Sequence, residues 1–370
     1  AAIVHRSCSS CHRPGQPAPF SLLTYNDVFK KRSFVVEVTE SGYMPPWQPT
    51  HGDFVGDRRL SEQDLATIKR WVAAGAPRGD QSKEPKAPNF TTGWQLGEPD
   101  AIIRMPEVLE VPAAGADIVR NFVVPIALER MRYVAAVEIR PGCRAVHHAV
   151  LGVDRTRQSR QADAADAGPG FSGMTLGAAI PPDGHFLGWT PGKSVQRSAE
   201  GMAWRLLPGD DFVLQLHAVP VGKQEQVQPE IGIWFTDKPT QNVFDLVMLF
   251  SEEIDVAPGV SDFVLRDHLV LPAAVTLHAV YPHAHYVCRK MQATATLPDG
   301  TVRVLFAIDN WDFDWQDDYR YRQPIDLPAG TRLAIEYVYD NSEDNDNNPV
   351  RPLQRVRFGQ QSADEMGTCT

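Results

Sequence analysis

The run Cys8-Ser9-Ser10-Cys11-His12 is the feature that most restricts what this chain can fold into. It places two thiols three residues apart, with an imidazole directly after the second. C-x-x-C-H is the attachment signature of a c-type haem, in which both thiols bond to the porphyrin and the histidine ligates the iron. A zinc site would need a second ligand pair at short spacing, and the sequence has no second C-x-x-C. We therefore expect one covalent haem held by Cys8, Cys11 and His12.

The residues that follow this motif fit a small haem domain. Met44 lies in the rigid run Gly-Tyr-Met-Pro-Pro-Trp, which would hold its thioether against the open face of the iron. Ligation by a histidine and a methionine raises the reduction potential of a haem. Alternatively, Met44 is an ordinary packing residue. A helix is predicted over Ser61–Ala74, because Ser61 and Asp64 have capping-box spacing. Residues 1–80 resemble a small, all-α class I cytochrome c domain.

Length and composition predict a mainly β remainder. A chain of 370 residues exceeds what one hydrophobic core usually supports. Its 30 prolines and 27 glycines separate short apolar runs, a pattern typical of β-sandwiches and jelly rolls. We expect a linker at 81–98 and two tandem jelly-roll-like β-sandwich domains at 99–240 and 241–370. Residues 158–173 are small and polar, and they are predicted to form a mobile loop.

Charge and hydropathy limit the partners. The formal net charge of −10 at pH 7 argues against binding nucleic acid or an anionic membrane surface. No run of 18 apolar residues occurs, so no integral membrane segment is expected. Because haem attachment of this type takes place outside the bacterial cytoplasm, we expect a periplasmic or secreted protein whose export signal has been removed.

Six of the eleven histidines form three clusters beyond the linker: His147-His148, His217, and His278 with His283-Ala284-His285. Residues i and i+2 of a strand face the same side, so His283 and His285 can reach one metal ion. Adjacent His147 and His148 would face opposite sides of a regular strand. Their joint ligation therefore requires a bulge or a strand end. His217 ends an apolar run and is placed to turn inward.

The types of these residues favour copper. Imidazoles combined with a late methionine thioether suit an ion that cycles between Cu(I) and Cu(II). A cupin iron site would need a glutamate shortly after H-x-H, and a zinc hydrolase would show H-E-x-x-H; neither is present. Cys143, four residues before His147, is an alternative thiolate ligand. A single histidine is more often structural than a ligand, so the expectation of a metal site depends on the clustering of the histidines.

The order of the motifs resembles the copper type II, ascorbate-dependent monooxygenases, the family of peptidylglycine α-hydroxylating monooxygenase and dopamine β-monooxygenase. The motifs are His-His, Leu-Gln-Leu-His, Pro-His-Ala-His and Asp-Glu-Met near a cysteine, over about residues 100–370. With its haem motif, the chain resembles the bacterial cytochrome-fused branch of that family. The resemblance implies an electron-storing copper on His147, His148 and His217. It implies a second copper, where O2 is activated, on His283, His285 and Met366.

The resemblance also implies an activity, the hydroxylation of a C–H bond in a small organic substrate by O2. Electrons would come from ascorbate or a periplasmic redox protein, through the haem and two copper ions. Tyr281 and Thr368 replace an arginine and an asparagine found in peptide-amidating members, so peptidylglycine is not expected as the substrate. Of the family's disulfides, one is expected, Cys288–Cys369.

Two other function classes stay open at this point. A non-enzymatic periplasmic protein for electron transfer or copper handling would use the same ligands, but would not couple O2 consumption to an organic product. A haem-based peroxidase would need an open iron position, which ligation by Met44 would exclude. Rapid reoxidation of the reduced, copper-loaded protein in air would favour the monooxygenase.

Overall fold

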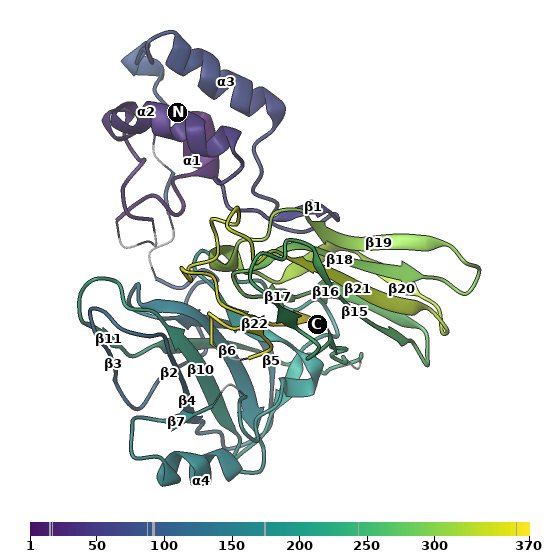
Figure 1. The fold of residues 1–370 in the computed structure, drawn as a ribbon. Helices are drawn as coiled ribbons and strands as arrows, with labels where there is room; N and C mark the ends of the chain where they lie inside the picture. The colour runs from purple at the N-terminus through teal and green to yellow at the C-terminus, as the bar shows by residue number, and fades with distance from the viewer. Residues whose placement is uncertain are drawn as a thin grey trace.

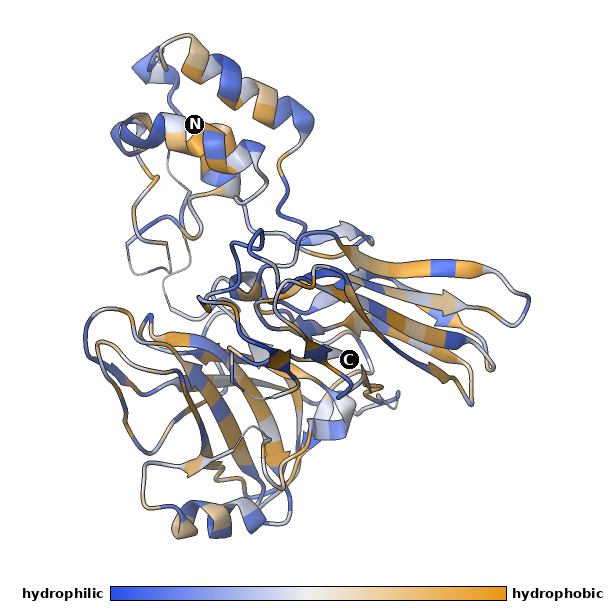
Figure 2. Ribbon diagram, in the orientation of Figure 1, coloured by the Kyte–Doolittle hydropathy of each residue, from blue (hydrophilic) through white to orange (hydrophobic). Residues whose placement is uncertain are grey.

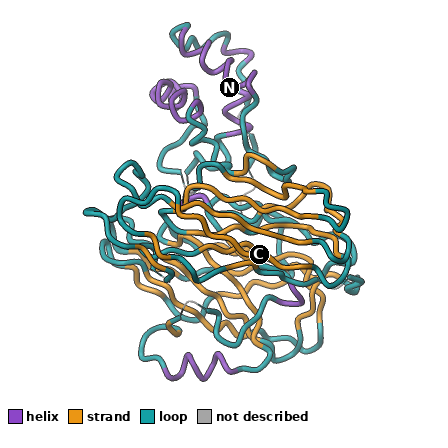
Figure 3. The backbone as a smooth tube through the Cα atoms, turned by 45° about the vertical axis from the view of Figure 1, so that its right-hand side comes forward, coloured by secondary structure: helices purple, strands orange, loops and turns teal. Residues whose placement is uncertain are grey.

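The computed structural model describes residues 1–14, 16, 18–86, 88–90, 93–173, 175–242, 244–359 and 361–370. The chain is mainly antiparallel β, as predicted, with α1–α3 gathered at the N-terminal end and α4 (Gln158–Ala165) at the opposite end of the molecule (Figures 1 and 3). Three parts are distinguished below. The helical unit contains α1–α3, the first β unit contains β2–β12, and the second β unit contains β13–β23. The predicted linker at 81–98 includes residues 87, 91 and 92, which lie outside the described residues.

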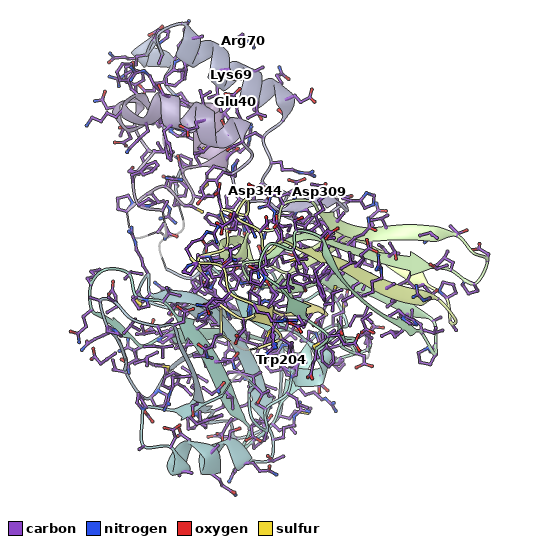
Figure 4. All side chains as sticks on the ribbon, viewed as in Figure 1. Glu40, Lys69, Arg70, Trp204, Asp309 and Asp344 are labelled. Atoms are coloured by element: carbon purple, nitrogen blue, oxygen red, sulfur yellow. The ribbon has the colours of Figure 1, made fainter. Side chains whose placement is uncertain are left out.

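The helical unit consists of α1 (Ala2–Ser7), α2 (Tyr25–Glu40) and α3 (Glu62–Ala73). The helix predicted to start at Ser61 is confirmed, since the Ser61 hydroxyl accepts a hydrogen bond from the backbone N–H of Asp64 at 3.1 Å. Glu40 and Lys69, labelled in Figure 4, form an ion pair that joins α2 to α3. The described hydrophobic cluster of this unit is small: its buried members are Val4, Leu22 and Val28.

Between α2 and α3 the chain leaves the helical unit. This crossing segment, residues 41–60, adds β1 (Pro49–His51) to β19 (Val302–Ile308) of the second β unit. Phe54 follows β1 and is 1% exposed in the core of that unit, where it bridges to Tyr321. The predicted domain at 1–80 stays a prediction, but the chain within it is shared between two parts of the molecule.

The first β unit has two sheets around one core. One sheet has the order β2 (Ala101–Arg104), β12 (Glu230–Thr236), β5 (Arg132–Arg140), β9 (Trp204–Leu206). The other has the order β7 (Phe171–Ser172), β4 (Ile118–Pro125), β10 (Asp211–Ala218), β6 (Val146–Asp154), β8 (Leu187–Trp189). A short pair, β3 (Leu109–Val111) with β11 (Glu225–Val227), adds to them. Side chains from both sheets, such as Trp204 and Phe212, share one hydrophobic cluster, which defines a β-sandwich.

The second β unit is built on a five-stranded sheet in the order β1, β19, β18 (Cys288–Thr296), β21 (Arg332–Tyr339), β15 (Phe263–Val270). A smaller sheet has the order β13 (Leu249–Phe250), β23 (Gly367–Cys369), β17 (Pro282–Ala284). Two pairs complete it: β14 (Asp255–Val256) with β22 (Val356–Arg357), and β16 (Val275–Val280) with β20 (Tyr319–Leu327). Apolar and polar residues alternate along these strands, as the colours in Figure 2 show.

The prediction of a mobile loop at 158–173 is wrong. Residues Gln158–Ala165 form helix α4, and β7 pairs with β4 just after it. Arg160 of the helix forms an ion pair with Asp211 at 2.6 Å, and Asp166 accepts a hydrogen bond from Arg120 at 2.9 Å. These partners lie about 50 residues away in the sequence, so local composition could not reveal the ordering.

The predicted Cys288–Cys369 disulfide is also absent from the described residues, where all five cysteines are free thiols. Cys288 pairs with Tyr339 in the five-stranded sheet, whereas Cys369 pairs with Pro282 and Leu249 in the smaller one. The two cysteines therefore belong to different sheets. Over the described residues, no helix has both the length and the apolar character needed to cross a membrane.

Candidate metal centre

Three histidines of the first β unit converge where β6 and β10 pair. His217 lies directly opposite His148, while the next residue, Ala218, lies opposite Val146. The ladder skips His147, which is therefore the extra residue of a β-bulge. The structure thus has a bulge here, one of the two irregularities that joint ligation by His147 and His148 was expected to require. One nitrogen from each of the three imidazoles lies within 4.8 Å of the others, which is a spacing that one metal ion can span.

Hydrogen bonds orient two of these rings. His217 Nδ1 lies 3.0 Å from His148 Nε2, and His217 Nε2 lies 3.0 Å from a carboxylate oxygen of Asp117. The hydrogen bond from His217 lowers the pKa of Asp117, outweighing the effect of burial. Asp117 therefore favours the tautomer with the proton on Nε2, which leaves Nδ1 directed at the cluster. Ser362 of the second β unit donates to the same carboxylate oxygen at 2.8 Å.

His147 supplies the strongest indication of a metal. Both of its ring nitrogens are buried, and neither has a hydrogen-bond partner among the described residues. Its Nε2 lies 3.6 Å from Asp314, which is longer than a hydrogen bond. An unsatisfied buried polar group is costly in a native protein. A metal ion bound between the three imidazoles would give one of these two nitrogens a partner, so the residues present fit the expected ion.

His283 and His285 form a second set in the second β unit, with ring centroids 5.2 Å apart. His283 Nδ1 lies 2.6 Å from Gln316 Oε1, and His285 Nδ1 lies 3.1 Å from the carbonyl oxygen of Asp364. These acceptors place the proton of each ring on Nδ1 and leave each Nε2 free to bind a metal. Burial lowers the pKa of His283 to about 4 and that of His285 to about 3. Both rings are therefore held neutral, as metal ligation requires.

Strand register places Met366 beside this second set. β17 and β23 pair with His283 opposite Thr368 and Ala284 opposite Gly367. Continued by one residue, that antiparallel register brings Met366 opposite His285. Facing residues of an antiparallel pair project to the same side, and so do His283 and His285. The backbone therefore agrees with the three-residue ligand set that the resemblance implies, and ligation by the Met366 sulfur stays a prediction.

The side chain of one aromatic residue contacts both histidine sets. Phe313, in the 3-10 turn η3 (Phe313–Trp315), stacks on His147 with ring centroids 5.1 Å apart and planes at 21°. Its ring meets His285 edge-on at 5.6 Å. Burial strongly lowers the pKa of His148, and the neighbouring imidazoles of both sets lower it further. The two sets are thus near enough to influence one another.

The haem motif lies in the helical unit directly after α1. His12 is 9% exposed, and its Nδ1 lies 3.1 Å from the carbonyl oxygen of Phe20, which leaves Nε2 free for an iron ion. Cys11 faces the first β unit, since a methyl group placed on Gly192 would lie 3.5 Å from its sulfur. No ring contact or hydrogen bond joins the described His12 to Met44, whose N–H donates to Val38. Axial ligation by Met44 stays a prediction.

Sequence reasoning missed the residues that support these side chains. Glu365 is fully buried and accepts hydrogen bonds from the backbone N–H groups of His285, Val287, Cys288 and Met366. Burial raises its pKa to about 8 against the effect of those bonds. Glu365 thus joins the H-x-H strand to the methionine segment, the link for which a disulfide was predicted. Glu365 could have been suspected from its position next to Met366, whereas nothing in the sequence pointed to Asp117 or Gln316.

Comparisons with known proteins add little to this geometry. No family model and no curated protein sequence matches the chain. Among solved structures, PNGF-II aligns over 73% of this chain and 65% of its own length, with 8% identity and a TM-score of 0.28. The chain thus spans just under two thirds of PNGF-II. A two-domain protein of unknown function from Bacteroides fragilis aligns over 69% of this chain and 84% of its own, with 8% identity and a TM-score of 0.19. The tandem CBM22 domains of Paenibacillus barcinonensis Xyn10C align over 76% and 96%, with 10% identity and a TM-score of 0.14.

Proposed function

We propose that this chain is a copper-dependent monooxygenase that hydroxylates a C–H bond of a small organic substrate, according to R–H + O2 + 2e⁻ + 2H⁺ → R–OH + H2O. The electrons come from an external donor, either ascorbate or a periplasmic redox protein, through a covalently attached haem c. The observation that carries the proposal is the pair of histidine sets that both contact Phe313. In the first set, the buried nitrogens of His147 lack any other partner among the described residues.

The division of labour follows from the residues. His147, His148 and His217 would hold one copper ion, and His283, His285 and Met366 the other. A haem held by Cys8, Cys11 and His12 would supply electrons singly, and copper ions on these two ligand sets would supply one-electron storage and O2 binding. Because the reaction consumes two electrons, two metal sites in one chain allow both to be held before O2 is reduced. A thioether ligand at the second set favours the reduced ion that binds O2.

The protein's own contribution is orientation and exclusion of water. Asp117, Gln316 and the carbonyl of Asp364 each hold one imidazole by the nitrogen that does not face the metal. Tyr281 lies parallel to the His283 ring at 6.4 Å and stacks on Phe186 at 4.5 Å. These aromatic rings cover one side of the second set, which limits the access of water to the site of chemistry.

The small hydrophobic core of the helical unit supports the haem assignment. Its described cluster of three buried residues is a small core for a unit of this length. Phe34 is 45% exposed. A haem attached at Cys8 and Cys11 would add a large apolar surface beside that cluster. The proposal includes a class I-like cytochrome c domain at 1–80, jelly-roll-like domains at 99–240 and 241–370, and a periplasmic or secreted location.

The first test is the content of iron, copper and zinc per chain, measured after haem maturation and copper loading. One iron and two coppers are expected, followed by O2 uptake coupled to a hydroxylated product in a substrate screen. One iron without stably bound copper would contradict the proposal. Two coppers without coupled O2 uptake by any substrate would instead favour electron transfer or copper handling.

A further inference from the structure

The turn Asp312–Gln316 is the place where the crossing segment meets both histidine sets. It belongs to the second β unit and precedes β20. On one side it contacts the crossing segment that begins at the end of α2. On the other side its side chains reach both histidine sets.

The crossing segment holds the backbone of this turn through one side chain. Gln48 Nε2 donates to the carbonyl oxygen of Trp315 at 2.8 Å, and Gln48 Oε1 accepts from the N–H of Asp312 at 2.6 Å. Both the nitrogen and the oxygen of the Gln48 amide therefore form hydrogen bonds with the turn. Gln48 and Asp312 are 264 residues apart in the sequence. The Tyr43 ring adds an edge-on contact with the Trp315 ring at 6.0 Å.

The other side of the turn holds a predicted metal ligand. Gln316 is 3% exposed; its Oε1 lies 2.6 Å from His283 Nδ1, and its Nε2 donates to the carbonyl of Phe313 at 3.0 Å. A buried amide with both ends engaged has one orientation, so its oxygen is fixed toward His283. That acceptor selects the Nδ1–H tautomer and directs His283 Nε2 at the metal.

We propose that the turn Asp312–Gln316 is a positioning element through which the crossing segment sets the geometry of the second metal site. Gln48 holds the turn, and Gln316 holds the imidazole of His283. The inference rests on the proposed function only in taking His283 as a copper ligand. It makes the crossing segment, which connects two helices of the haem-bearing helical unit, a structural determinant of the site where O2 would be activated.

The test is a copper titration of the full, haem-containing chain against a competing Cu(I) chelator, with the EPR spectrum of the Cu(II) form as a second readout. Gln316→Leu removes the acceptor, so the affinity for one of the two coppers should fall about 10–100-fold. Gln316→Glu should retain it, because a buried protonated carboxyl can accept from His283 and donate to Phe313. Gln48→Leu should weaken the same copper by a smaller factor and leave the haem content unchanged.

Gln95→Leu is the matched control. Gln95 also uses both ends of its amide on distant backbone, donating to Lys193 at 3.1 Å and accepting from Val195 at 3.0 Å, but it touches neither histidine set. Both coppers should bind it with wild-type affinity. If Gln316→Leu does not fold, Gln316→Asn, whose shorter amide cannot reach His283, takes its place.

The outcomes separate this inference from the proposed function. Two coppers bound with wild-type affinity by Gln316→Leu or Gln316→Asn would overturn the role of Gln316. A loss in Gln316→Leu with no change in Gln48→Leu would overturn the link to the crossing segment. A wild-type chain that binds no copper would instead overturn the proposed function.

Discussion

His217 Nδ1 and His148 Nε2 lie 3.0 Å apart across the β10–β6 pair, and the bulged His147 stands next to them with both nitrogens unpartnered. At this separation one of the two nitrogens of the His148–His217 pair donates a proton to the other. A metal ion would take the lone pairs of both, and of His147 as well. The arrangement needs the bulge, because a regular strand would turn His147 away.

Replacing His147 with alanine should therefore remove one metal site. We expect His147→Ala to retain its haem and to bind one copper per chain in place of two, measured by elemental analysis after copper loading. His51→Ala, at an exposed position of β1, should bind as much copper as the wild type. Two coppers in His147→Ala would show that this cluster is not a ligand set.

Replacing Met366 with alanine should separate hydroxylation of the substrate from reduction of the haem. Met366→Ala should lose turnover, because it would remove the thioether that is proposed to favour the reduced ion at the second set. Reduction of the haem by an external donor, followed by its absorbance, should be unchanged, since the haem motif lies in the helical unit. Hydroxylation at the wild-type rate in this variant would exclude Met366 from the site.

Replacing Cys8 and Cys11 with serine should abolish covalent haem. The double variant should release its haem on extraction with acidified organic solvent, and its helical unit should be cleaved faster by protease, because its described core is small. Cys143→Ser is the control, since Cys143 packs against the core of the first β unit. Haem that remains covalently bound in the double variant would refute the attachment assignment.

Asp154 should stabilise the first β unit in a pH-dependent way. Burial would raise its pKa, but hydrogen bonds from Thr156 and Ser159 outweigh burial and lower it to about 2. A carboxyl whose pKa is depressed on folding stabilises the protein above its unfolded-state pKa, and that stability is lost as the pH falls toward 2. The contribution at pH 7 is about 2 kcal/mol.

Asp154→Asn should accordingly unfold at lower urea concentration than the wild type at pH 7, with a difference that shrinks as the pH is lowered from 4 toward 2. Unfolding is followed by circular dichroism. Asp309→Asn, at an exposed aspartate labelled in Figure 4, should leave the transition in place. An Asp154→Asn chain as stable as the wild type at pH 7 would contradict the role given to these hydrogen bonds.

Short-range patterns predicted much of the candidate site. The C-x-x-C-H run, the Ser61 cap and the i, i+2 spacing of His283 and His285 each depend on neighbours within a few residues. The need for a bulge at His147-His148 could be stated in advance for the same reason, because strand geometry fixes which side each residue faces. The mainly β character followed from the spacing of apolar runs between turns.

Long-range contacts could not be predicted in this way. The partners of His217, His283 and His285, namely Asp117, Gln316 and Asp364, lie 100, 33 and 79 residues from them. Helix α4 was not predicted, because the residues with which it forms ion pairs are also far away in the sequence. The link expected from a disulfide is instead made by Glu365, whose role depends on burial.

The sequence by itself determined which side chains can share a face of a strand or a turn, and therefore which residue types are available as ligands. Only the tertiary structure decided which of these faces meet, where the crossing segment joins the second β unit, and which polar groups orient each imidazole. The physical reason is that local geometry repeats every few residues, whereas register and packing depend on the whole chain burying its apolar surface at once.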